Sequence, residues 1–527
     1  MTPLSGPSAA PARARFPRAT LWLLGLAVLG PGSLTADRPN IVIIMADDLG
    51  YGDPGCLNPD SAIPTPHLDR LARSGRRYTD AHSPSAVCTP TRYGLLTGRY
   101  SWRTAMKSGV LGGYSKPLLE PGRPTIASFL QQHGYRTGAV GKWHLGMAMP
   151  LLSADAAVSQ WQGDPGIDFA GVITDSPVHH GFDYYFGVSA SLDMAPYAYI
   201  RNDRFTMLPS RQQPAVKFPG FVRQGPRAED FVIDQVLDRL TDEAVRFIET
   251  RSGEEAPYFL YVPCTAPHKP VQPAAEFRGR THAGDYGDFV AQVDAATGRI
   301  LAAIEASGGA DNTLVVFTSD NGSFMFRRDD RQPDHVDDPT IQAYRADRHR
   351  ANGPWRGTKA DIYEGGHRVP FLVRWPGRIE AGSQSGQTIC HVDLFATCAE
   401  IIGAELPTGA AEDSFSFLDP ADGQTRRRPV PVIHQSGSGM LALRDGPWKL
   451  VAGNGSGGRQ KPAGKRDQRP FQLYNLADDP GEQRDVADQQ PQRLAEMTDM
   501  LAALRAARGS RQYLQDRTGQ AESQPPR

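Results

Sequence analysis

The stretch of this chain best suited to chemistry is Cys88-Thr-Pro-Thr-Arg92, where a polar loop gives way to a helical pattern. Pro90 favours the first turn of a helix, because proline has no N–H that needs an acceptor and its φ is already set. The unpaired N–H groups and the dipole of that helix end stabilise an anion beside Cys88, and Arg92 can reach the same anion. The pentapeptide indicates an anion site, although taken alone it fits a buried cysteine before an ordinary helix equally well.

Acidic and amide side chains stand at the ends of two short apolar runs. Asp47-Asp48 ends one run and Asp320-Asn321 ends the other. Adjacent carboxylates repel each other unless a cation lies between them, so these oxygens indicate a site for a divalent cation. Both pairs also have an ordinary interpretation as turns, because Asp can cap the next element and Asp-Asn-Gly is a frequent turn sequence.

Basic and histidine side chains follow two further apolar runs. Lys142 and His144 are separated by one residue, and His268 lies between two nearby prolines. A histidine between prolines has a restrained backbone, which holds a proton donor at a fixed distance from its target. The alternatives are a solvated Lys-x-His loop and a structural loop histidine.

The longer run Cys-Thr-Pro-Thr-Arg-x-x-Leu-Leu-Thr-Gly-Arg, residues 88–99, resembles the signature of the type I, formylglycine-dependent, arylsulfatase-like sulfatases of the alkaline phosphatase superfamily. Most members have serine where this chain has Thr91, which keeps the hydroxyl. Gly-Lys-Trp-His-Leu-Gly at 141–146 and Ala-Pro-His-x-Pro at 266–270 also match motifs of that family. The resemblance covers nearly the whole mature chain.

The resemblance implies that a formylglycine-generating or equivalent modifying enzyme reads Cys-x-Pro-x-Arg and converts Cys88 to Cα-formylglycine. The aldehyde would hydrate to a gem-diol, one hydroxyl of which attacks sulfur, and the other would later lose its proton so that sulfate is expelled. The family also implies a divalent cation, Ca²⁺ rather than Mg²⁺, and all-oxygen ligands favour either ion over zinc. The matched metal-binding positions are Asp47, Asp48, Cys88, Asp320 and Asn321.

The same resemblance assigns roles to single positions. The matched catalytic residues are Cys88, Arg92, Lys142, His144, His268 and Lys359, and the matched substrate-binding residues are Lys142, Ser191, His268 and Lys359. The arginine and the two lysines would supply positive charge to the transition state. His268 would protonate the departing alkoxide, and His144 would contact the formylglycine oxygen and assist the elimination.

The elements that position these residues alternate along the chain. Apolar runs predict strands and amphipathic stretches predict helices, which together indicate an α/β fold with a large, mostly parallel mixed sheet flanked by helices. Ligands of such sheets bind beyond the carboxyl ends of the strands, so the polar clusters should meet at one edge. Strands are expected at 40–46, before Lys142, and at 258–262, 313–318 and 370–375, and helices at 66–74, 124–133, 229–249, 284–307 and 390–403.

Length and composition divide the 527 residues into four expected segments. The N-terminal segment has arginines, then an apolar run shorter than the roughly 20 residues of a membrane span, then small residues, which is the layout of a secretory signal peptide. The segments are a signal peptide at 1–36, a catalytic domain at 37–405, a small C-terminal α+β domain at 406–508 and a disordered tail at 509–527. The small domain is expected to form an antiparallel sheet, with strands at 440–451 and 471–476, and one helix at 492–505.

Charge and cysteine content limit the possible binding partners and the cellular compartment. A net charge of −1 argues against binding nucleic acid or a membrane surface through bulk electrostatics. The signal-like segment predicts export to a periplasmic, secreted or lumenal location, with no membrane span. Five cysteines are an odd number in an exported chain, and conversion of Cys88 accounts for the extra one. Cys390 and Cys398 are not expected to pair, because on one helix they would be about 12 Å apart.

These patterns predict a hydrolase that converts carbohydrate or aryl sulfate monoesters to the alcohol and inorganic sulfate. The rivals are a phosphate or phosphonate ester hydrolase of the same superfamily and an inactive sulfated-glycan-binding protein. Inserts at 147–178, 195–228 and 323–352 are expected at the rim of the site, and the polar residues of the last favour a saccharide. The basic stretch 452–469 is expected to be a mobile loop or to overhang the site and touch an anionic substrate.

Overall fold

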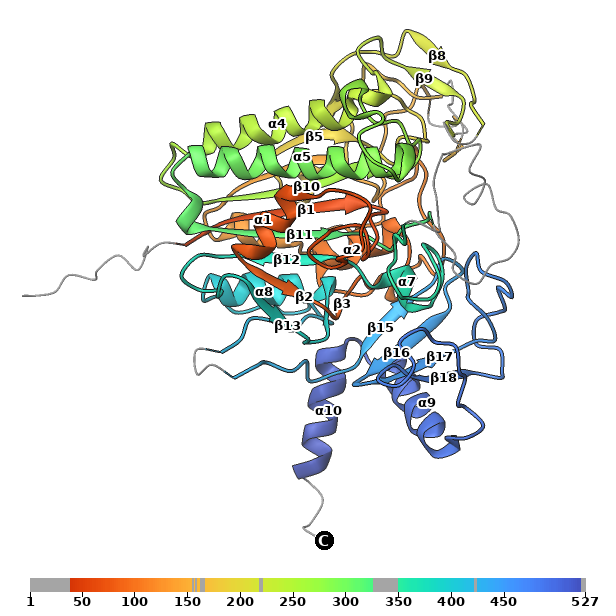
Figure 1. Ribbon diagram of the computed structural model, residues 1–527. Helices are drawn as coiled ribbons and strands as arrows, with labels where there is room; N and C mark the ends of the chain where they lie inside the picture. The colour runs from red at the N-terminus through yellow and green to blue at the C-terminus, as the bar shows by residue number, and fades with distance from the viewer. Residues whose placement is uncertain are drawn as a thin grey trace, which may run out of the picture. The chain divides into compact units, whose positions relative to one another are not determined.

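The computed structural model describes residues 38–522, except 154–155, 157–158, 162–165, 218–220, 326–348 and 421–423. The expected signal peptide therefore lies outside the described residues. The centre of the fold is a ten-stranded mixed sheet with the order β13-β2-β12-β11-β1-β10-β4-β5-β6-β7 (Figure 1). Its strands are β1 (Asn40–Asp47), β2 (Arg76–Tyr78), β4 (Arg136–Lys142), β5 (Tyr184–Val188), β6 (Ile200–Arg201), β7 (Arg204–Phe205), β10 (Tyr258–Pro267), β11 (Thr313–Ser319), β12 (Phe371–Arg374) and β13 (Ser383–Ser385).

The middle of the sheet is parallel and wholly buried. β1 pairs in parallel with β10 on one side and β11 on the other, and β4 and β5 extend the parallel part beyond β10. The residues of β1 from Ile41 to Asp47 are all buried, as expected for an apolar run that is covered on both faces. β12 runs antiparallel to β11, so the sheet is mixed, in agreement with the predicted fold class.

Two groups of helices flank this sheet. In the first group α5 contacts both α1 and α4, and in the second α2, α3 and α8 contact one another. Figure 1 shows α4 and α5 side by side along the sheet. The bounds are α1 (Pro66–Arg73), α2 (Cys88–Thr97), α3 (Ile126–Gln132), α4 (Val236–Arg251), α5 (Gly284–Ala306), α7 (Glu364–His367) and α8 (Leu394–Ile401). Short 3₁₀ turns are η1 (Ser101–Arg103), η2 (Pro177–His180), η3 (Ile233–Gln235), η4 (Ala275–Phe277), η5 (Ala310–Asn312) and η6 (His391–Asp393).

A small antiparallel sheet follows in the C-terminal part, as predicted. It consists of β15 (Val432–Gln435), β16 (Leu441–Asp445), β17 (Trp448–Val451) and β18 (Gln472–Asn475), and α9 (Pro491–Ala506) packs on β17. Two further pairs of short strands lie elsewhere: β3 (Ala81–His82) with β14 (Ile389–Cys390), and β8 (Arg211–Gln213) with β9 (Gly225–Arg227).

Several predicted element boundaries were wrong. The expected strand 440–451 is a hairpin, β16 and β17, because a tight turn at Gly446 reverses the chain. Helix α4 starts only at Val236, since Phe231 is buried from a loop, against tyrosine rings, rather than from the helix. Cys390 ends a strand instead of starting a helix, and α8 begins at Leu394.

The tail after Gly509 is helical rather than disordered over most of its length. Helix α10 (Ser510–Glu522) begins at a buried serine whose hydroxyl donates to Asp413 Oδ1 at 2.7 Å. Tyr513 is also buried, so the tail is anchored by contacts with residues that lie far away in the sequence.

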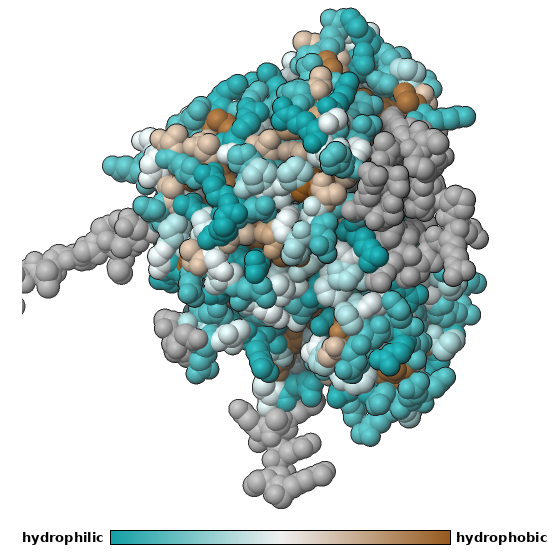
Figure 2. All heavy atoms as spheres, viewed as in Figure 1, coloured by the Kyte–Doolittle hydropathy of each residue, from teal (hydrophilic) through white to brown (hydrophobic). Residues whose placement is uncertain are grey.

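The surface agrees with a water-exposed protein. In the face shown in Figure 2, hydrophilic residues predominate and the hydrophobic ones are scattered. Within the described residues no helix is both long enough and apolar enough to cross a membrane. The five cysteines are all free, and Cys390 and Cys398 do not pair. The expected reason was wrong, because Cys390 ends β14 and does not share a helix with Cys398.

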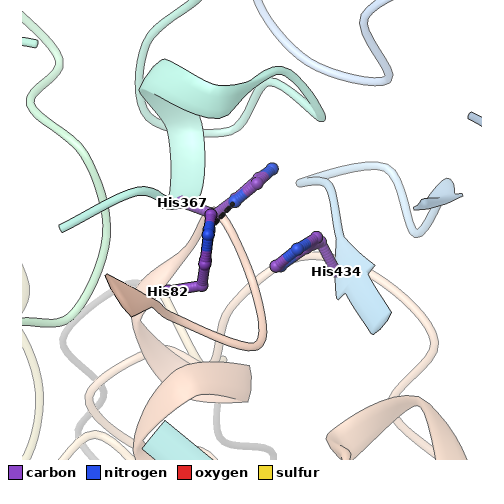
Figure 3. A group of neighbouring side chains, drawn as sticks. All are labelled: His82, His367 and His434. Atoms are coloured by element: carbon purple, nitrogen blue, oxygen red, sulfur yellow. Dashed lines mark hydrogen bonds between the residues drawn. The ribbon is translucent and has the colours of Figure 1, made fainter. Parts of the chain in front are cut away.

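A buried polar cluster joins the small sheet to earlier parts of the chain. His82 of β3, His367 of α7 and His434 of β15 have no exposed surface and face one another (Figure 3). The rings of His367 and His434 are stacked, with centroids 3.7 Å apart, and His82 Nδ1 lies 3.1 Å from His367 Nδ1. The three elements come from distant parts of the chain, so this contact ties the small sheet to β3 and α7.

Lys449 of β17 completes this junction. Its Nζ lies 3.0 Å from Glu364 Oε1, 2.8 Å from Glu482 Oε1 and 3.1 Å from His367 Nε2, and the lysine and both glutamates are fully buried. Burying charges is costly unless each is paired. Glu364 also lies 2.9 Å from Arg368 Nη1, so Glu482 is the carboxylate that depends most on this lysine.

We therefore expect Lys449→Met to lower the free energy of unfolding by about 3–5 kcal/mol, because it leaves two buried carboxylates without their shared cation. Chemical denaturation of the purified protein measures the change. Lys465→Met, at an exposed position of the same part of the chain, is the control. A loss below about 1 kcal/mol, the range of a surface ion pair, would show that the junction does not depend on Lys449.

Candidate active site

Four neighbouring strands end at the same edge of the sheet and carry the predicted polar clusters. Asp47 ends β1, Lys142 ends β4, His268 follows the last residue of β10, and Asp320 follows the last residue of β11. Because these strands are parallel neighbours, their carboxyl ends converge, and the expected meeting of the clusters at one edge is what the structure shows.

Cys88 is the first residue of α2, and the whole helix is buried. Its Sγ lies 3.6 Å from Asp47 Oδ1 and 3.4 Å from Lys359 Nζ. Thr91 holds the first turn in place by donating its hydroxyl to Ser85 O at 2.9 Å. The sulfur is thus fixed between a carboxylate of the sheet edge and a lysine from a distant loop.

The environment of Cys88 keeps its thiol protonated. Burial raises its pKa to about 12, even though the charges of Lys142 and Lys359 act in the opposite direction. Only the thiolate is a strong nucleophile, so the unmodified side chain is inert at neutral pH.

Three buried carboxylates at this edge are each matched by a cation. Lys142 Nζ lies 2.6 Å from Asp47 Oδ2, and Lys359 Nζ lies 2.6 Å from Asp48 Oδ1. Arg92 is also fully buried, and its guanidinium lies 2.8 Å from Asp320 Oδ2. It also donates to the carbonyl of Lys142 at 2.8 Å, which links α2 to β4.

These cations do not fully balance the site. Burial, followed by the charge of Asp320, raises the pKa of Asp47 to about 7, despite the nearby Lys142 and Arg92. Asn321 donates its amide to Asp48 Oδ1 at 2.7 Å, while its own Oδ1 is buried and has no hydrogen-bond partner. A buried acceptor without a partner is costly, and crowded carboxylates favour a further positive charge. The oxygens of Asp47, Asp48, Asp320 and Asn321 therefore fit a hard divalent cation.

Distances between possible metal-ligand atoms indicate a cation site at the same place. Asp47, Asp48, Cys88 and His268 each have a ligand atom within 4.8 Å of the others. This group shares three members with the set expected from the sequence. Asp320 does not belong to it, and its carboxylate faces Arg92.

The two predicted histidines are buried beside the sulfur but make different contacts. His268 Nε2 lies 3.7 Å from Asp48 Oδ2, and its Nδ1 lies 2.5 Å from the carbonyl oxygen of Lys269. His144 Nε2 lies 2.7 Å from the carbonyl oxygen of Leu111, and its Nδ1 has no partner. Burial, then nearby lysines, lowers the pKa of both rings well below the usual value, so both are neutral at pH 7.

A cavity of about 440 Å³ opens above Cys88. Its inner residues, all buried, are Cys88, His144, Ser191, His268 and Lys359. The Ser191 hydroxyl has no hydrogen-bond partner in the structure. The other predicted site residues do not line the cavity but lie behind it: Asp47, Asp48, Arg92, Lys142, Asp320 and Asn321.

Five charged or aromatic residues that line the cavity were not among the predicted site residues: Trp161, Asp193, Arg223, Lys269 and Arg459. Trp161 and Arg223 come from two of the inserts expected at the rim, whereas the third insert lies mostly outside the described residues. Arg459 belongs to the basic stretch 452–469, which was expected either to be a mobile loop or to overhang the site. Its position in the cavity wall agrees with the second of these expectations. Lys269 directly follows the predicted His268, so the motif around that histidine could have indicated it.

Comparison with known proteins agrees with this geometry. The sulfatase family model matches residues 39–404. An N-acetylgalactosamine-6-O-sulfatase of Bacteroides thetaiotaomicron is 32% identical over 508 residues, covering 89% of this chain and 94% of that protein. Human arylsulfatase A is 32% identical over 477 residues, covering 87% of this chain and 85% of that protein.

Solved structures show the same relationship. A structure from work on the metabolism of multiple glycosaminoglycans by Bacteroides thetaiotaomicron has a TM-score of 0.76 and 30% identity, and covers 90% of this chain and 100% of that one. A phosphonate monoester hydrolase from Silicibacter pomeroyi shares the fold, with a TM-score of 0.58, 18% identity and coverage of 90% of this chain and 96% of that one. With a family match over most of its length and close relatives that span nearly all of it, this chain belongs to the sulfatase family and is a sulfuric ester hydrolase.

Proposed function

We propose that this protein hydrolyses a sulfate monoester of a saccharide and that its nucleophile is formed from Cys88 by conversion to Cα-formylglycine. The observation that carries the proposal is the position of Cys88, which opens on the cavity between Asp47 and Lys359. Its thiol is protonated and therefore inert, so the site needs a different nucleophile at this position. The similarity to an N-acetylgalactosamine-6-O-sulfatase supports a carbohydrate substrate.

The proposed cofactor is Ca²⁺, held by Asp47, Asp48, Asp320, Asn321 and the modified side chain at position 88. When bound, such an ion neutralises sulfate oxygens and lowers the pKa of a nearby hydroxyl. Its charge would also release Lys142 and Lys359 from their present carboxylate partners to meet the sulfate group. Arg92 would remain with Asp320 and hold that carboxylate in place.

His268 is the proposed general acid. A carbonyl oxygen only accepts, so Nδ1 must donate its proton to Lys269 O, and the second proton of the acid form has to sit on Nε2. The neutral ring found here gains that proton when an anionic sulfate ester enters, because the added negative charge raises the pKa of the histidine. Nε2 then donates the proton to the departing sugar oxygen.

His144 is the proposed base for the release of sulfate. Its Nε2 must donate to Leu111 O, which leaves Nδ1 unprotonated and free to accept a proton. Both His144 and Cys88 line the cavity, so this acceptor lies on the same side as the nucleophile. Ser191, whose hydroxyl has no partner, is the proposed additional contact to the sulfate group.

Export is proposed together with this function. The arginines and apolar run before residue 37 have the layout of a signal peptide, and the conversion of Cys88 requires a modifying enzyme that acts on the chain. Rates on matched sulfate and phosphate esters separate the proposed activity from that of a phosphate or phosphonate ester hydrolase.

We expect Cys88→Ala to lower kcat for sulfate release by more than about 1,000-fold, because it removes the nucleophile. Sulfate release from N-acetylgalactosamine 6-sulfate and from 4-nitrophenyl sulfate measures the loss, and peptide mass spectrometry shows whether the native residue is an aldehyde. Cys398→Ala, at a buried cysteine in α8, should stay active and serves as the control. Full activity of the Cys88 variant, or an intact thiol in active native protein, would contradict the assignment.

His268→Ala should slow sugar sulfates about 100-fold and aryl sulfates with good leaving groups less than about tenfold, since only a poor leaving group needs the proton. The two kcat values are compared within one protein preparation. Lys359→Ala, which removes charge from the sulfate rather than a proton donor, should reduce both substrates alike. If His268→Ala also reduced both alike, the acid role would have to be withdrawn.

Removing divalent cations should inactivate the protein and lower its melting temperature, because an ion that binds only the folded state stabilises that state. Calorimetric titration of chelator-treated protein should show Ca²⁺ binding more tightly than Mg²⁺. Asn321→Leu, which removes the unpartnered oxygen, should weaken Ca²⁺ binding about tenfold or more. Unchanged affinity in this variant would exclude Asn321 as a ligand.

A further inference from the structure

The outer part of the cavity carries more positive charge than it can neutralise. Arg223 forms an ion pair with Asp193, and its guanidinium also lies 5.4 Å from the ring centroid of Trp161. Lys269 and Arg459 line the same cavity, and within the described part of the chain neither forms an ion pair. Two cations therefore face this space in addition to Lys359, which is paired with Asp48.

Arg459 is fixed in a position where it lacks a partner. Its backbone N–H donates to Asp361 Oδ1 at 2.6 Å, and the preceding Gly458 donates to Ser456 Oγ at 3.0 Å, so the loop is anchored where the arginine meets the cavity. The Nη1 atom of the side chain is buried and makes no hydrogen bond. A buried donor without an acceptor is costly, which is the situation of a binding group before its ligand arrives.

Lys269 is held in a similar way. Its Nζ lies 4.1 Å from the ring centroid of Phe221, a distance that suits a cation–π contact. Burial lowers the pKa of Lys269 to about 8. The charge of Asp193 acts to raise this pKa, whereas the charges of Arg459 and Lys359 lower it further. The side chain is thus still largely charged at pH 7, and it repels the arginine across the cavity. An anion placed between the two would relieve that repulsion.

We infer that Lys269 and Arg459 bind a second anionic group of the substrate, a carboxylate or a further sulfate, on the same sugar or on the adjoining one. The inference rests on the proposed function, because the scissile sulfate has to occupy the inner residues around Cys88. The cavity volume of about 440 Å³ lies within the range of roughly 300–1,000 Å³ that small-molecule sites occupy. A neutral alcohol such as a sterol would bury both cations without a partner, which is costly. The favoured substrate is therefore an acidic saccharide.

The test compares substrates that differ only in the second anion. N-acetylgalactosamine 6-sulfate carries one anion, its 4,6-disulfate carries two, and a disaccharide in which it is joined to a hexuronic acid also carries two. The carboxyl-reduced disaccharide keeps the 6-sulfate and is the one-anion counterpart of the last. In the native enzyme we expect a KM about tenfold lower for at least one of the two-anion substrates than for its one-anion counterpart. The substrate that shows this difference identifies the second group.

Arg459→Gln and Lys269→Gln should each reduce that KM advantage severalfold, with kcat less affected, because they remove one of the two cations. Lys461→Gln, which removes an exposed positive charge from the same stretch, should keep the advantage. An equal KM for one-anion and two-anion substrates, or an advantage that survives in Arg459→Gln, would overturn the inference while sulfate release still supports the proposed function.

A binding measurement keeps the two proposals separate. If no sulfate is released from any substrate, the proposed function fails, and calorimetric titration of the native protein with the same four sugars still tests the second-anion site. Tighter binding of a two-anion sugar that is lost in Arg459→Gln would support the site. Equal binding of all four sugars would reject it.

Discussion

The structure depends on a single electrostatic constraint, the burial of three carboxylates at one edge of a sheet. Asp47, Asp48 and Asp320 are almost fully removed from water, so each of them requires a positive partner. Those partners have to come from elsewhere, and the fold brings Arg92 on α2 and Lys359 on a distant loop to the same edge. The parallel pairing of the central strands places the carboxylates at this edge, and the buried helix α2 brings Arg92 to them.

The same burial that demands partners also prepares the chemistry. The low polarity around Cys88 keeps its thiol protonated, and it keeps His144 and His268 neutral. An arriving anionic ester would favour the protonated form of the two histidines, and an arriving cation would favour the ionised form of the side chain at position 88. Around Cys88, the oxygen of Asn321, the Nδ1 atom of His144 and the hydroxyl of Ser191 are buried and have no hydrogen-bond partner among the described residues.

The inner and outer parts of the cavity have different origins. The inner residues lie at the start of α2, shortly after strands or, in the case of Lys359, on a loop, and they are positions that the sequence motifs predicted. Part of the outer wall comes from loops that connect the strands of the C-terminal sheet, because Gly437 and Gly457–Arg459 line the cavity. The cluster formed by His434, Lys449 and their partners joins that sheet to α7 and β3.

The central strands, and the polar side chains that follow them, could be predicted from the sequence. A strand buried on both faces leaves an unbroken apolar run, and Asp47, Lys142 and His268 follow such runs directly. Two features could not be predicted from the sequence: the helical tail, which is anchored through Asp413, and the position of Lys269 and Arg459 in the cavity wall. Within its own segment, each of these three residues resembles an ordinary solvated residue. Lys269 and Arg459 share one cavity because of the tertiary fold. Repulsion between charges from distant segments leaves no local pattern in the sequence, so this proximity could not be predicted.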